Sequence, residues 1–444
     1  MTLDELKKII TDAGCVGAGG AGFPSAVKLA EGADTLMINA AECEPLLYSD
    51  YTLMKRHLDD VAAGAEYVLE ATGIKQSLLG VKQHTAERLG LTDGQSLSAH
   101  VSVKCLPNVY PMGDEVILIY QALGRIVPPG QLPLTVGVIV MNAETLYNVC
   151  HAVREGTPVI HKWVTVNGKV PHPFVTVVPV GTPVRELMAH YDFSVPEDCV
   201  MIDGGPAMGP IIDPEKAVIT KTTKGLLVLP RMAPAIRSKL ANNRTVMTHA
   251  SANCCQCSIC SDMCPRALIG YPLRPHRIVR NSLSMIEENP ESFLEASVCC
   301  GCGVCELTAC CQGISPRRVY QQVKGILAKN KLRYQYKGET LTPDPDREYR
   351  MLPSERFMQR IGVAEFDTGI PEFLPEEYTP AVIRLPLRQH VGAPATAQVA
   401  IGDSVSVGQC VAAANGLISA NIHSSVNGIV EDVSASDITI RVNG

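Results

Sequence analysis

Two cysteine-rich segments contain the residues best suited to metal chemistry. They hold eleven of the 17 cysteines, between Cys254 and Cys311. When one member of each cysteine doublet is counted, the first segment reads C-x2-C-x2-C-x3-C-P and the second reads C-x2-C-x2-C-x4-C. Three thiolates spaced in this way can bind one [4Fe–4S] cube, while the fourth points toward a neighbouring cube. The spacing therefore predicts two [4Fe–4S] clusters and a function in electron transfer.

Each predicted cluster takes three ligands from one segment and the fourth from the other. The thiols of Cys255, Cys300 and Cys311 are alternative ligands, because each forms a doublet with a predicted one. A zinc site is less consistent with triplets, since zinc sites use paired C-x2-C units. A disulfide framework is not expected in a chain of 444 residues without a secretory signal. The predicted ligands are Cys254, Cys257, Cys260 and Cys310 for one cluster and Cys264, Cys299, Cys302 and Cys305 for the other.

A glycine-rich loop near the N-terminus has the composition of a phosphate-binding loop. Gly17, Gly19 and Gly22 satisfy the pattern G-x-G-x-x-G. A predicted helix precedes the loop where a dinucleotide fingerprint would have a strand. Backbone amides at the start of the following helix, predicted over 24–31, could still approach a phosphate closely, and Lys28 lies on that helix. The alternatives are a plain tight turn for the loop and a solvated side chain for the lysine.

Two pairs of carboxylates lie where strands end or helices begin. Glu42 and Glu44 follow a predicted buried strand over 35–40. Asp114 and Glu115 stand at the start of a predicted helix that reaches residue 123. In open α/β sheets, ligands bind at the carboxyl ends of the strands, so these side chains could bind ribose or amide groups. The alternative for both pairs is a favourable charge at a helix N-terminus.

Alternating helix and strand patterns in the first part of the chain predict the α/β layers that would position these loops. A mixed α+β region follows, in which Asn167-Gly168 predicts the turn of a β-hairpin. The cysteine segments form a helical module, a Pro-, Asp- and Glu-rich stretch predicts a linker or wrapping arm, and short strands separated by Gly, Asn and Ser predict a small all-β domain. The expected boundaries are 1–155, 156–235, 240–335, 336–378 and 379–444.

Four motifs resemble the flavin-binding subunit of respiratory complex I and, more closely, the C subunit of Rnf-type electron-transfer complexes. They are Gly-Ala-Gly-Gly-Ala-Gly-Phe-Pro at 17–24, Asn-Ala-Ala-Glu-Cys-Glu-Pro at 39–45, Tyr-Pro-Met-Gly-Asp-Glu at 110–115 and Met-Asn-Ala-Glu-Thr at 141–145. In that family these loops bind FMN and admit NADH. The resemblance implies FMN contacts from Gly17, Gly19, Gly20, Gly22, Lys28, Asn39, Glu42, Gly113, Asn142 and Thr145, and nicotinamide contacts from Phe23, Glu44 and Glu115.

The later segments resemble two further domains of the same family. Residues 156–235 resemble its β-grasp domain, which binds soluble ligands, and 379–444 resemble its barrel-sandwich domain. In the Rnf subunit the barrel-sandwich domain comes first, whereas here it comes last. This order resembles the cobalamin reductases of bacterial microcompartments that break down 1,2-propanediol. No lysine occurs from residue 376 to 444, which excludes a lipoyl or biotin carrier.

The predicted function is electron transfer from NADH through FMN and two [4Fe–4S] clusters, with no catalytic acid or base. A flavin is required because nicotinamide gives up two electrons together while a cluster accepts them singly. The resemblance implies cobalamin as acceptor, reduced from cob(III)alamin to cob(II)alamin and toward cob(I)alamin. It also implies a corrinoid adenosyltransferase and a microcompartment shell protein as partners, and a location in a bacterial microcompartment within the cytoplasm.

Two alternative functions are an NADH-dehydrogenase subunit of an Rnf-type complex and a non-enzymatic Fe–S interaction module. The net charge of -6 argues against nucleic acid as a partner. No apolar run approaches the roughly 18 residues of a transmembrane helix, so no transmembrane segment is expected.

Overall fold

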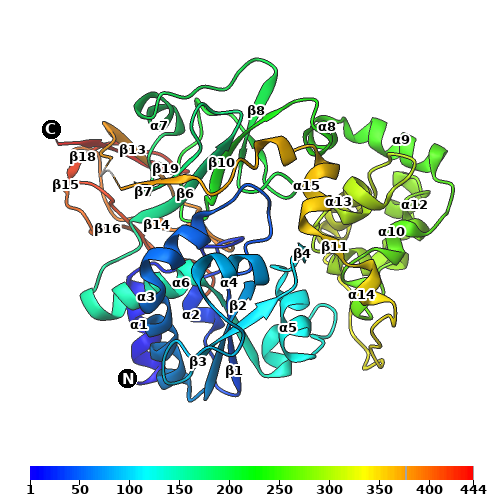
Figure 1. Ribbon diagram of the computed structural model, residues 1–444. Coiled ribbons are helices and arrows are strands. Elements are labelled where there is room, and N and C mark those ends of the chain that lie inside the picture. Colours follow the sequence, from blue (N-terminus) through cyan, green and yellow to red (C-terminus); the bar gives the residue numbers. More distant parts are fainter. Residues whose placement is uncertain (376–377, 444) are drawn as a thin grey trace.

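The computed structural model describes residues 1–375 and 378–443 (Figure 1). Its N-terminal domain contains a four-stranded parallel sheet in the order β3-β2-β1-β5. From β1 the chain first adds β2 and β3 on one side, and later adds β5 on the other side of β1. The carboxyl ends of β1 and β5 therefore flank a topological switch point. Open α/β sheets bind ligands at such points. The strands are β1 (Thr35–Asn39), β2 (Gln76–Lys82), β3 (Val101–Leu106) and β5 (Val138–Asn142).

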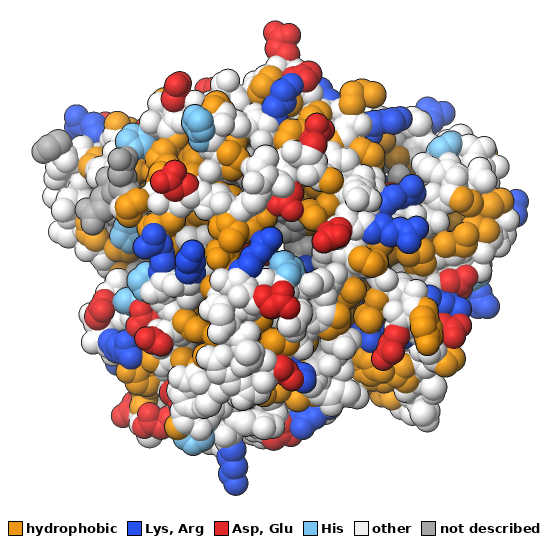
Figure 2. All heavy atoms as spheres, in the orientation of Figure 1, with side chains coloured by type: hydrophobic (Ala, Val, Ile, Leu, Met, Phe, Trp, Pro, Cys, Tyr) orange, Lys and Arg blue, Asp and Glu red, His pale blue; other side chains and the backbone are white. Residues whose placement is uncertain are grey.

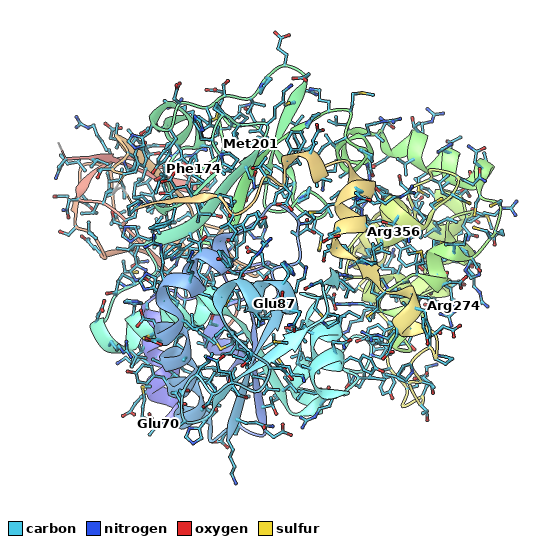
Figure 3. The ribbon with its side chains drawn as sticks, in the orientation of Figure 1. Glu70, Glu87, Phe174, Met201, Arg274 and Arg356 are labelled. Atoms are coloured by element: carbon cyan, nitrogen blue, oxygen red, sulfur yellow. The ribbon has the colours of Figure 1, made fainter. Side chains whose placement is uncertain are left out.

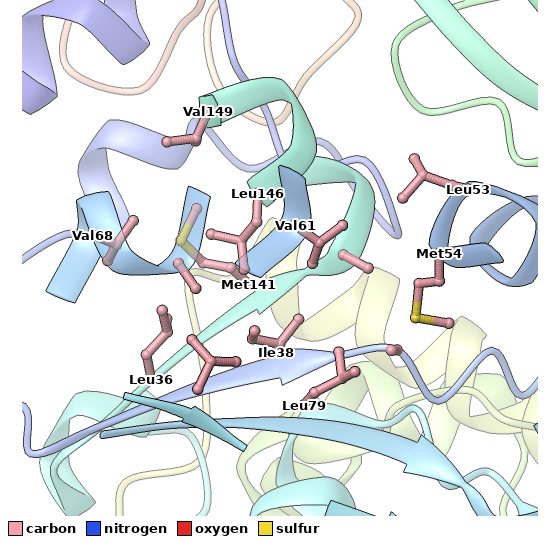
Figure 4. Packing of buried hydrophobic residues seen from close by; sticks show 14 of the residues in the cluster. Leu36, Ile38, Leu53, Met54, Val61, Val68, Leu79, Met141, Leu146 and Val149 are labelled. Carbon is pink, nitrogen blue, oxygen red and sulfur yellow. The ribbon is translucent and has the colours of Figure 1, made fainter. Parts of the chain in front are cut away.

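One face of this sheet packs against three helices, α1 (Leu3–Asp12), α3 (Ser49–Thr72) and α6 (Ala143–Glu155). Figure 4 shows Ile38 of the sheet beneath Val61 of α3 and Leu146 of α6, all of them buried. Each such side chain contributes about 1.5–3 kcal/mol when it is fully buried. Alternating apolar strands and amphipathic helices therefore produce the predicted α/β layers. The short helices of this domain are α2 (Ser25–Lys28), α4 (Gln83–Leu89) and α5 (Glu115–Leu123).

The other face of the sheet packs against α5 and the cysteine module. Met37 of β1 and Leu118 of α5 share an apolar core with Tyr271, Val319 and Val323 of the module. The cysteine module therefore packs against the N-terminal domain through one continuous apolar core. Its helices are α8 (Pro234–Leu240), α9 (Asn243–Asn253), α10 (Ile259–Asp262), α11 (Pro275–Ile278), α12 (Leu283–Glu288) and α13 (Pro316–Lys329), with 3-10 turns at Ala267–Ile269 and Pro290–Val298 and a π turn at Cys305–Ala309.

A six-stranded sheet in the order β12-β7-β6-β10-β8-β9 forms the second domain, and Phe174 and Met201 mark it in Figure 3. The predicted hairpin is present, but the predicted turn is wrong: Gly168 ends β6, and residues 169–173 make the connection to β7. Gly168 has φ +96°, and a Cβ there would lie 2.2 Å from the Val228 carbonyl oxygen. The elements are β6 (His161–Gly168), β7 (Phe174–Pro179), α7 (Val184–His190), β8 (Cys199–Asp203), β9 (Ile211–Ile212) and β10 (Gly225–Pro230).

The stretch 336–378, expected as a linker or wrapping arm, contributes strands to two other units. Its strand β11 (Leu352–Pro353) pairs with β4 (Val109–Tyr110), and β12 (Glu372–Leu374) pairs with β7. Between them, α15 (Ser354–Ile361) buries Phe357 against Tyr110. The arm therefore wraps from the cysteine module to the second sheet. Residues 376–377 of the arm and residue 444 lie outside the described part of the chain; the arm also contains α14 (Arg347–Arg350).

The C-terminal domain contains two small antiparallel sheets, in the orders β13-β19-β18-β15 and β14-β16-β17. Figure 2 shows acidic and basic side chains interspersed over one face of the molecule. Within the described residues, no helix is long and apolar enough to cross a membrane. The strands are β13 (Val382–Pro386), β14 (Thr396–Ala397), β15 (Ser404–Val405), β16 (Cys410–Ala413), β17 (Ile422–His423), β18 (Gly428–Val433) and β19 (Asp437–Val442).

Candidate flavin site and cysteine cavities

Four loops of the N-terminal domain meet at the switch point of the parallel sheet. Asn39 Nδ2 donates to the Gly113 carbonyl at 3.0 Å, and Asn142 Nδ2 donates to the Asn39 carbonyl at 3.2 Å. The glycine-rich loop joins them through Ala18, whose N–H donates to Thr145 Oγ1 at 3.0 Å. Residues predicted from four distant motifs are thus brought together at the position where an open α/β sheet binds its ligand.

The glycine loop leaves open space beside this junction. A Cβ at Gly19 would lie 2.8 Å from Asn142 Nδ2, so the backbone approaches that side chain closely. A Cβ at Gly20 would meet nothing within 4 Å, and both glycines are exposed. Gly17 N–H donates to the Phe23 carbonyl at 2.9 Å and closes the loop, leaving Phe23 partly exposed at its end. An exposed loop made of glycine and alanine fits a phosphate-bearing flavin.

Lys28 and Glu115 stand at the edge of the same site. Lys28 Nζ donates to the Val140 carbonyl at 3.2 Å and lies 3.5 Å from Glu115 Oε2. Their side chains are 32% and 39% exposed. A partly exposed ion pair of this kind contributes at most about 1 kcal/mol. Both groups can therefore exchange their mutual contact for contacts with a ligand.

A buried network of charges lies beneath the loops, and sequence reasoning missed most of it. Glu144 Oε2 accepts from Lys162 Nζ at 2.5 Å and from Lys224 Nζ at 2.9 Å. Lys224 also bonds to Asp50, and Lys162 donates to the Ala18 carbonyl at 3.2 Å. The second domain, which supplies both lysines, thereby holds the glycine loop in place. Lys162 lies in the mostly apolar run from Val159 to Val166, and a lysine in such a run is the sequence signal that could have revealed it.

Burial and neighbouring charges shift the pKa values of this network. Burial and the charge of Asp50 raise the pKa of Glu42 to about 7, and Glu42 Oε1 accepts from Ser49 Oγ at 3.1 Å. Burial lowers the pKa of Lys162 to about 8. Burial also opposes the charge of Lys224, but Asp50 and Glu144 outweigh it and raise the pKa of Lys224.

Glu44 faces away from the glycine loop, toward the other domains. Its carboxylate lies 3.0 Å from the Tyr110 hydroxyl and accepts from the Ala207 N–H at 2.9 Å. A Cβ at Gly205 would lie 2.1 Å from Glu44 Oε2, so the turn around Gly205 packs directly on the carboxylate. Burial raises the pKa of Glu44. The structure thus places Glu44 at the junction of the N-terminal domain, the second domain and the cysteine module.

The cysteine module contains two cavities lined by thiols. Each cavity combines cysteines from both segments, and each also receives at least one of the doublet thiols, so the doublets stay alternative ligands. We call them the outer cavity, which Cys257 opens to solvent, and the inner cavity, in which Cys302 is buried. The outer cavity is lined by Cys254, Cys255, Cys257, Cys260, Cys310 and Cys311, and the inner cavity by Cys264, Cys299, Cys300, Cys302 and Cys305.

The predicted ligand sets differ in spacing from a compact single-ion site. In the part of the chain that the structure describes, Cys255, Cys257 and Cys311 form the only group of three or more possible ligands whose atoms all lie within 4.8 Å of one another. A tetrahedral zinc ion with Zn–S bonds of about 2.3 Å would hold its sulfur ligands about 3.8 Å apart. In neither predicted set of four do three sulfur atoms all lie within 4.8 Å of one another, and the group that does combines Cys257 with the doublet thiols Cys255 and Cys311.

Comparison with known families identifies three of the domains. The family described as the Nuo51 FMN-binding domain matches residues 10–151, the 4Fe-4S dicluster domain matches 253–315, and the RnfC barrel sandwich hybrid domain matches 374–442. These matches confirm the predicted fold class and support FMN and Fe–S centres as cofactors.

Comparison with individual proteins extends the match over the whole chain. The cobalamin reductase PduS of Salmonella typhimurium is 39% identical over 446 residues, covering 99% of this chain and 97% of that protein. The cobalamin reductase PduS of Citrobacter freundii is 38% identical, covering 98% and 96%. The C subunit of the ion-translocating oxidoreductase complex of Rhodobacter capsulatus is 33% identical over 277 residues, covering 61% and 51%.

Proposed function

This chain belongs to the cobalamin reductase PduS family, and we propose that it transfers electrons from NADH, through FMN and two [4Fe–4S] clusters, to cobalamin. The acceptor cobalt is reduced from cob(III)alamin to cob(II)alamin and toward cob(I)alamin. Each NADH that becomes NAD⁺ and a proton releases two electrons, enough for two one-electron reductions of cobalt. Bound FMN supplies the exchange between two-electron and one-electron chemistry. The observation that carries the proposal is the presence of the flavin-type site and both thiol cavities in one packed unit.

We assign the flavin to the exposed space beside the glycine loop. The amides of Gly19 and Gly20 would meet the phosphate, and Asn39, Asn142 and Thr145 fix the loops around it. The other residues proposed to line the flavin are Gly17, Gly22, Lys28, Glu42 and Gly113.

For NADH we propose Phe23 and Glu115, which are both accessible at the edge of the flavin site. Glu44 would have to leave Tyr110 and Ala207 to reach a nucleotide, so we assign it to the junction with the cysteine module. For the clusters we propose Cys254, Cys257, Cys260 and Cys310 in the outer cavity, and Cys264, Cys299, Cys302 and Cys305 in the inner cavity.

Anaerobic reduction of the flavin by NADH tests the entry side of this function. The protein would be reconstituted with iron, sulfide and FMN, and the flavin absorbance followed as NADH is added. We expect NADH to bleach the flavin, and Glu115→Gln to weaken NADH use while cluster absorbance stays unchanged. A flavin that NADH does not bleach would refute the proposal. A flavin that is bleached without corrinoid reduction would favour an Rnf-type NADH-dehydrogenase subunit.

We extend the proposal to partners and location on the basis of family membership. The proposed partners are a corrinoid adenosyltransferase, which would consume the reduced cobalamin, and a shell protein of a bacterial microcompartment in the cytoplasm. We expect a tagged chain to sediment with purified microcompartments from its host. Recovery of the tagged chain outside that fraction would contradict the location.

A further inference from the structure

The inner cavity is tied to the flavin site by Arg266, the second residue after the ligand Cys264. Its guanidinium donates to Asp114 Oδ2 at 2.8 Å through Nη2 and at 3.2 Å through Nε. Nη1 donates to the Val298 carbonyl at 2.7 Å, one residue before Cys299. Asp114 is the N-cap of α5, beside Gly113 of the flavin site. One partly buried side chain thus connects both cysteine segments to a flavin loop.

Tyr110 makes a second connection between the same two places. Its hydroxyl lies 2.7 Å from the Cys302 carbonyl and 3.0 Å from Glu44 Oε1. The ring is 2% exposed and stacks on Phe357 at 3.8 Å between centroids. The backbone of an inner-cavity ligand is therefore held directly by the loop that also supplies Gly113.

The outer cavity opens at the surface. Cys255, Cys257 and Cys311 are exposed, with 3.9 Å between the sulfur atoms of Cys257 and Cys311. Gln256 donates to the His276 carbonyl at 2.7 Å, which places α11 at the rim of this opening. Arg274 and Arg277, on either side of His276, are exposed, and Figure 3 shows Arg274 at the edge of the module. The opening therefore presents accessible thiols, and the exposed Arg277 directly follows His276, which lines the cavity.

The two cavities are neighbours within the module. Helix α10, which carries Cys260 of the outer cavity, packs against the π turn that begins at Cys305 of the inner cavity. A continuous line therefore runs from the flavin loops to the inner cavity, then to the outer cavity, then to solvent.

We propose, building on the function proposed above, that the two cavities act in series. The inner cavity adjoins the electron donor side, and the outer cavity is the exit at which the corrinoid docks. The phosphodiester of the corrinoid would pair with the exposed Arg277, next in sequence to the cavity-lining His276, because guanidinium groups bind phosphate oxygens well. Arg266 and Tyr110 are positioning residues that hold the inner cavity against the flavin loops.

Removing one cluster at a time tests this order without any corrinoid. We would prepare Cys257→Ala/Cys260→Ala for the outer cavity and Cys302→Ala/Cys305→Ala for the inner cavity. Iron would be counted in each variant, and the electron paramagnetic resonance signal of the reduced cluster recorded after NADH and then after dithionite. We expect NADH to reduce the remaining cluster in the outer variant. In the inner variant we expect reduction by dithionite only. The reverse pattern would overturn the order.

Single substitutions keep the test decisive if a double variant loses both clusters. Arg266→Gln should slow cluster reduction by NADH while flavin bleaching keeps its rate; unchanged cluster reduction would overturn the positioning role. Arg277→Glu should leave flavin and cluster reduction unchanged and raise the KM for cobalamin about tenfold, as expected for loss of a charge-assisted contact. Lys8→Glu, at an exposed position of α1, is the matched control. An unchanged KM in Arg277→Glu would overturn the docking site.

These results separate the order from the proposed function. If wild-type protein reduces its clusters with NADH but transfers nothing to cobalamin, the proposed acceptor is wrong while the order of the cavities stands. If cobalamin is reduced but the inner variant still reduces its outer cluster with NADH, the function stands and the order is wrong.

Discussion

Glu144 helps to position the glycine loop of the flavin site, although it lies far from that loop in the sequence. Its carboxylate, 1% exposed, is shared by Lys162 and Lys224, and Lys162 in turn bonds to the carbonyl of Ala18 in the glycine loop. Removing one partner from a buried ion pair leaves the other charge uncompensated. The position of the glycine loop therefore depends on a carboxylate that does not itself need to touch a ligand.

Substituting Glu144→Gln tests this dependence. We expect the free energy of unfolding to fall by about 3 kcal/mol, the usual cost of breaking a buried pair, and FMN affinity to weaken because the loop loses its anchor. Denaturant unfolding and FMN fluorescence titration measure the two effects. Glu155→Gln, at an exposed position of the same helix, should change stability by no more than about 0.5 kcal/mol. Equal effects of both substitutions would contradict the assigned role.

Glu42 should make stability depend on pH in the neutral range. Its pKa is raised from 4.5 to about 7 by burial and by Asp50, so the unfolded chain loses this proton at lower pH than the folded protein. Stability therefore falls as pH rises from the unfolded value to the folded one, and levels off above it. Between about pH 6 and about pH 8 we expect the wild type to lose about 1 kcal/mol relative to Glu42→Gln. Parallel pH profiles for the two proteins, measured by denaturant unfolding, would show that the carboxyl is not buried as described.

At the scale of elements, the glycine loop and the N-terminus of α6 fit together closely. A methyl group at Gly19 would meet Asn142, the N-cap of α6, whereas one at Gly20 has open space in the protein. We expect Gly19→Ala to lower the stability of FMN-free protein by about 1 kcal/mol through the displaced cap. Gly20→Ala should leave that stability unchanged yet weaken FMN binding. If Gly20→Ala binds FMN as tightly as wild type does, the flavin does not approach this part of the loop.

The sequence predicts elements well where the signal is local. Strand–helix alternation predicted the α/β layers, since apolar periodicity determines which face of each element is buried. The tight turn predicted at Asn167-Gly168 is wrong. Gly168 instead allows Val228 of a neighbouring strand to approach closely. That contact depends on tertiary structure, and so does the pairing of β12 with β7 across about 200 residues of sequence.

In the candidate site too, the sequence predicted features with a local signal but not contacts that depend on tertiary structure. Glycines and asparagines of the flavin loops form recognisable motifs, so the sequence predicted which loops would meet. Asp50, Lys162 and Lys224 lie in no motif, because a buried ion pair can join any two elements that the fold brings together. Glu144 lies in the motif at 141–145, but the motif alone does not indicate its lysine partners. Glu44 follows the expected motif but bonds to Tyr110 and Ala207, partners that only the packing of three domains could provide.

At the scale of the whole molecule, the C-terminal domain packs against the glycine loop. A Cβ at Gly22 of the loop would lie 2.9 Å from the Gln389 carbonyl oxygen of the C-terminal domain. The fully buried Lys221 donates to the carbonyls of Gly14 and Asn421, at 2.7 and 2.8 Å. Through Lys221, the second domain thus links the C-terminal domain to Gly14, in the segment that precedes the glycine loop.

Substituting Lys221→Met tests this support. Two buried carbonyls would lose their donor, at a cost of about 1–3 kcal/mol in unfolding free energy, and we expect faster FMN dissociation and easier proteolytic cleavage near residue 380. Lys216→Met, whose side chain is 83% exposed, serves as the control and should behave as wild type. Unchanged FMN dissociation in Lys221→Met would show that the C-terminal domain does not support the loop.

We propose that one chain converts the electron pair of NADH into single-electron reductions of cobalamin. The most direct test is the anaerobic stoichiometry, with limiting NADH added to the reconstituted protein and excess hydroxocobalamin, and cob(II)alamin measured by its absorbance. We expect about two molecules of cob(II)alamin for each NADH consumed, because a hydride carries two electrons and cob(III)alamin accepts one. NADH consumption without cob(II)alamin formation, or cob(II)alamin formation that persists when FMN is omitted, would contradict it.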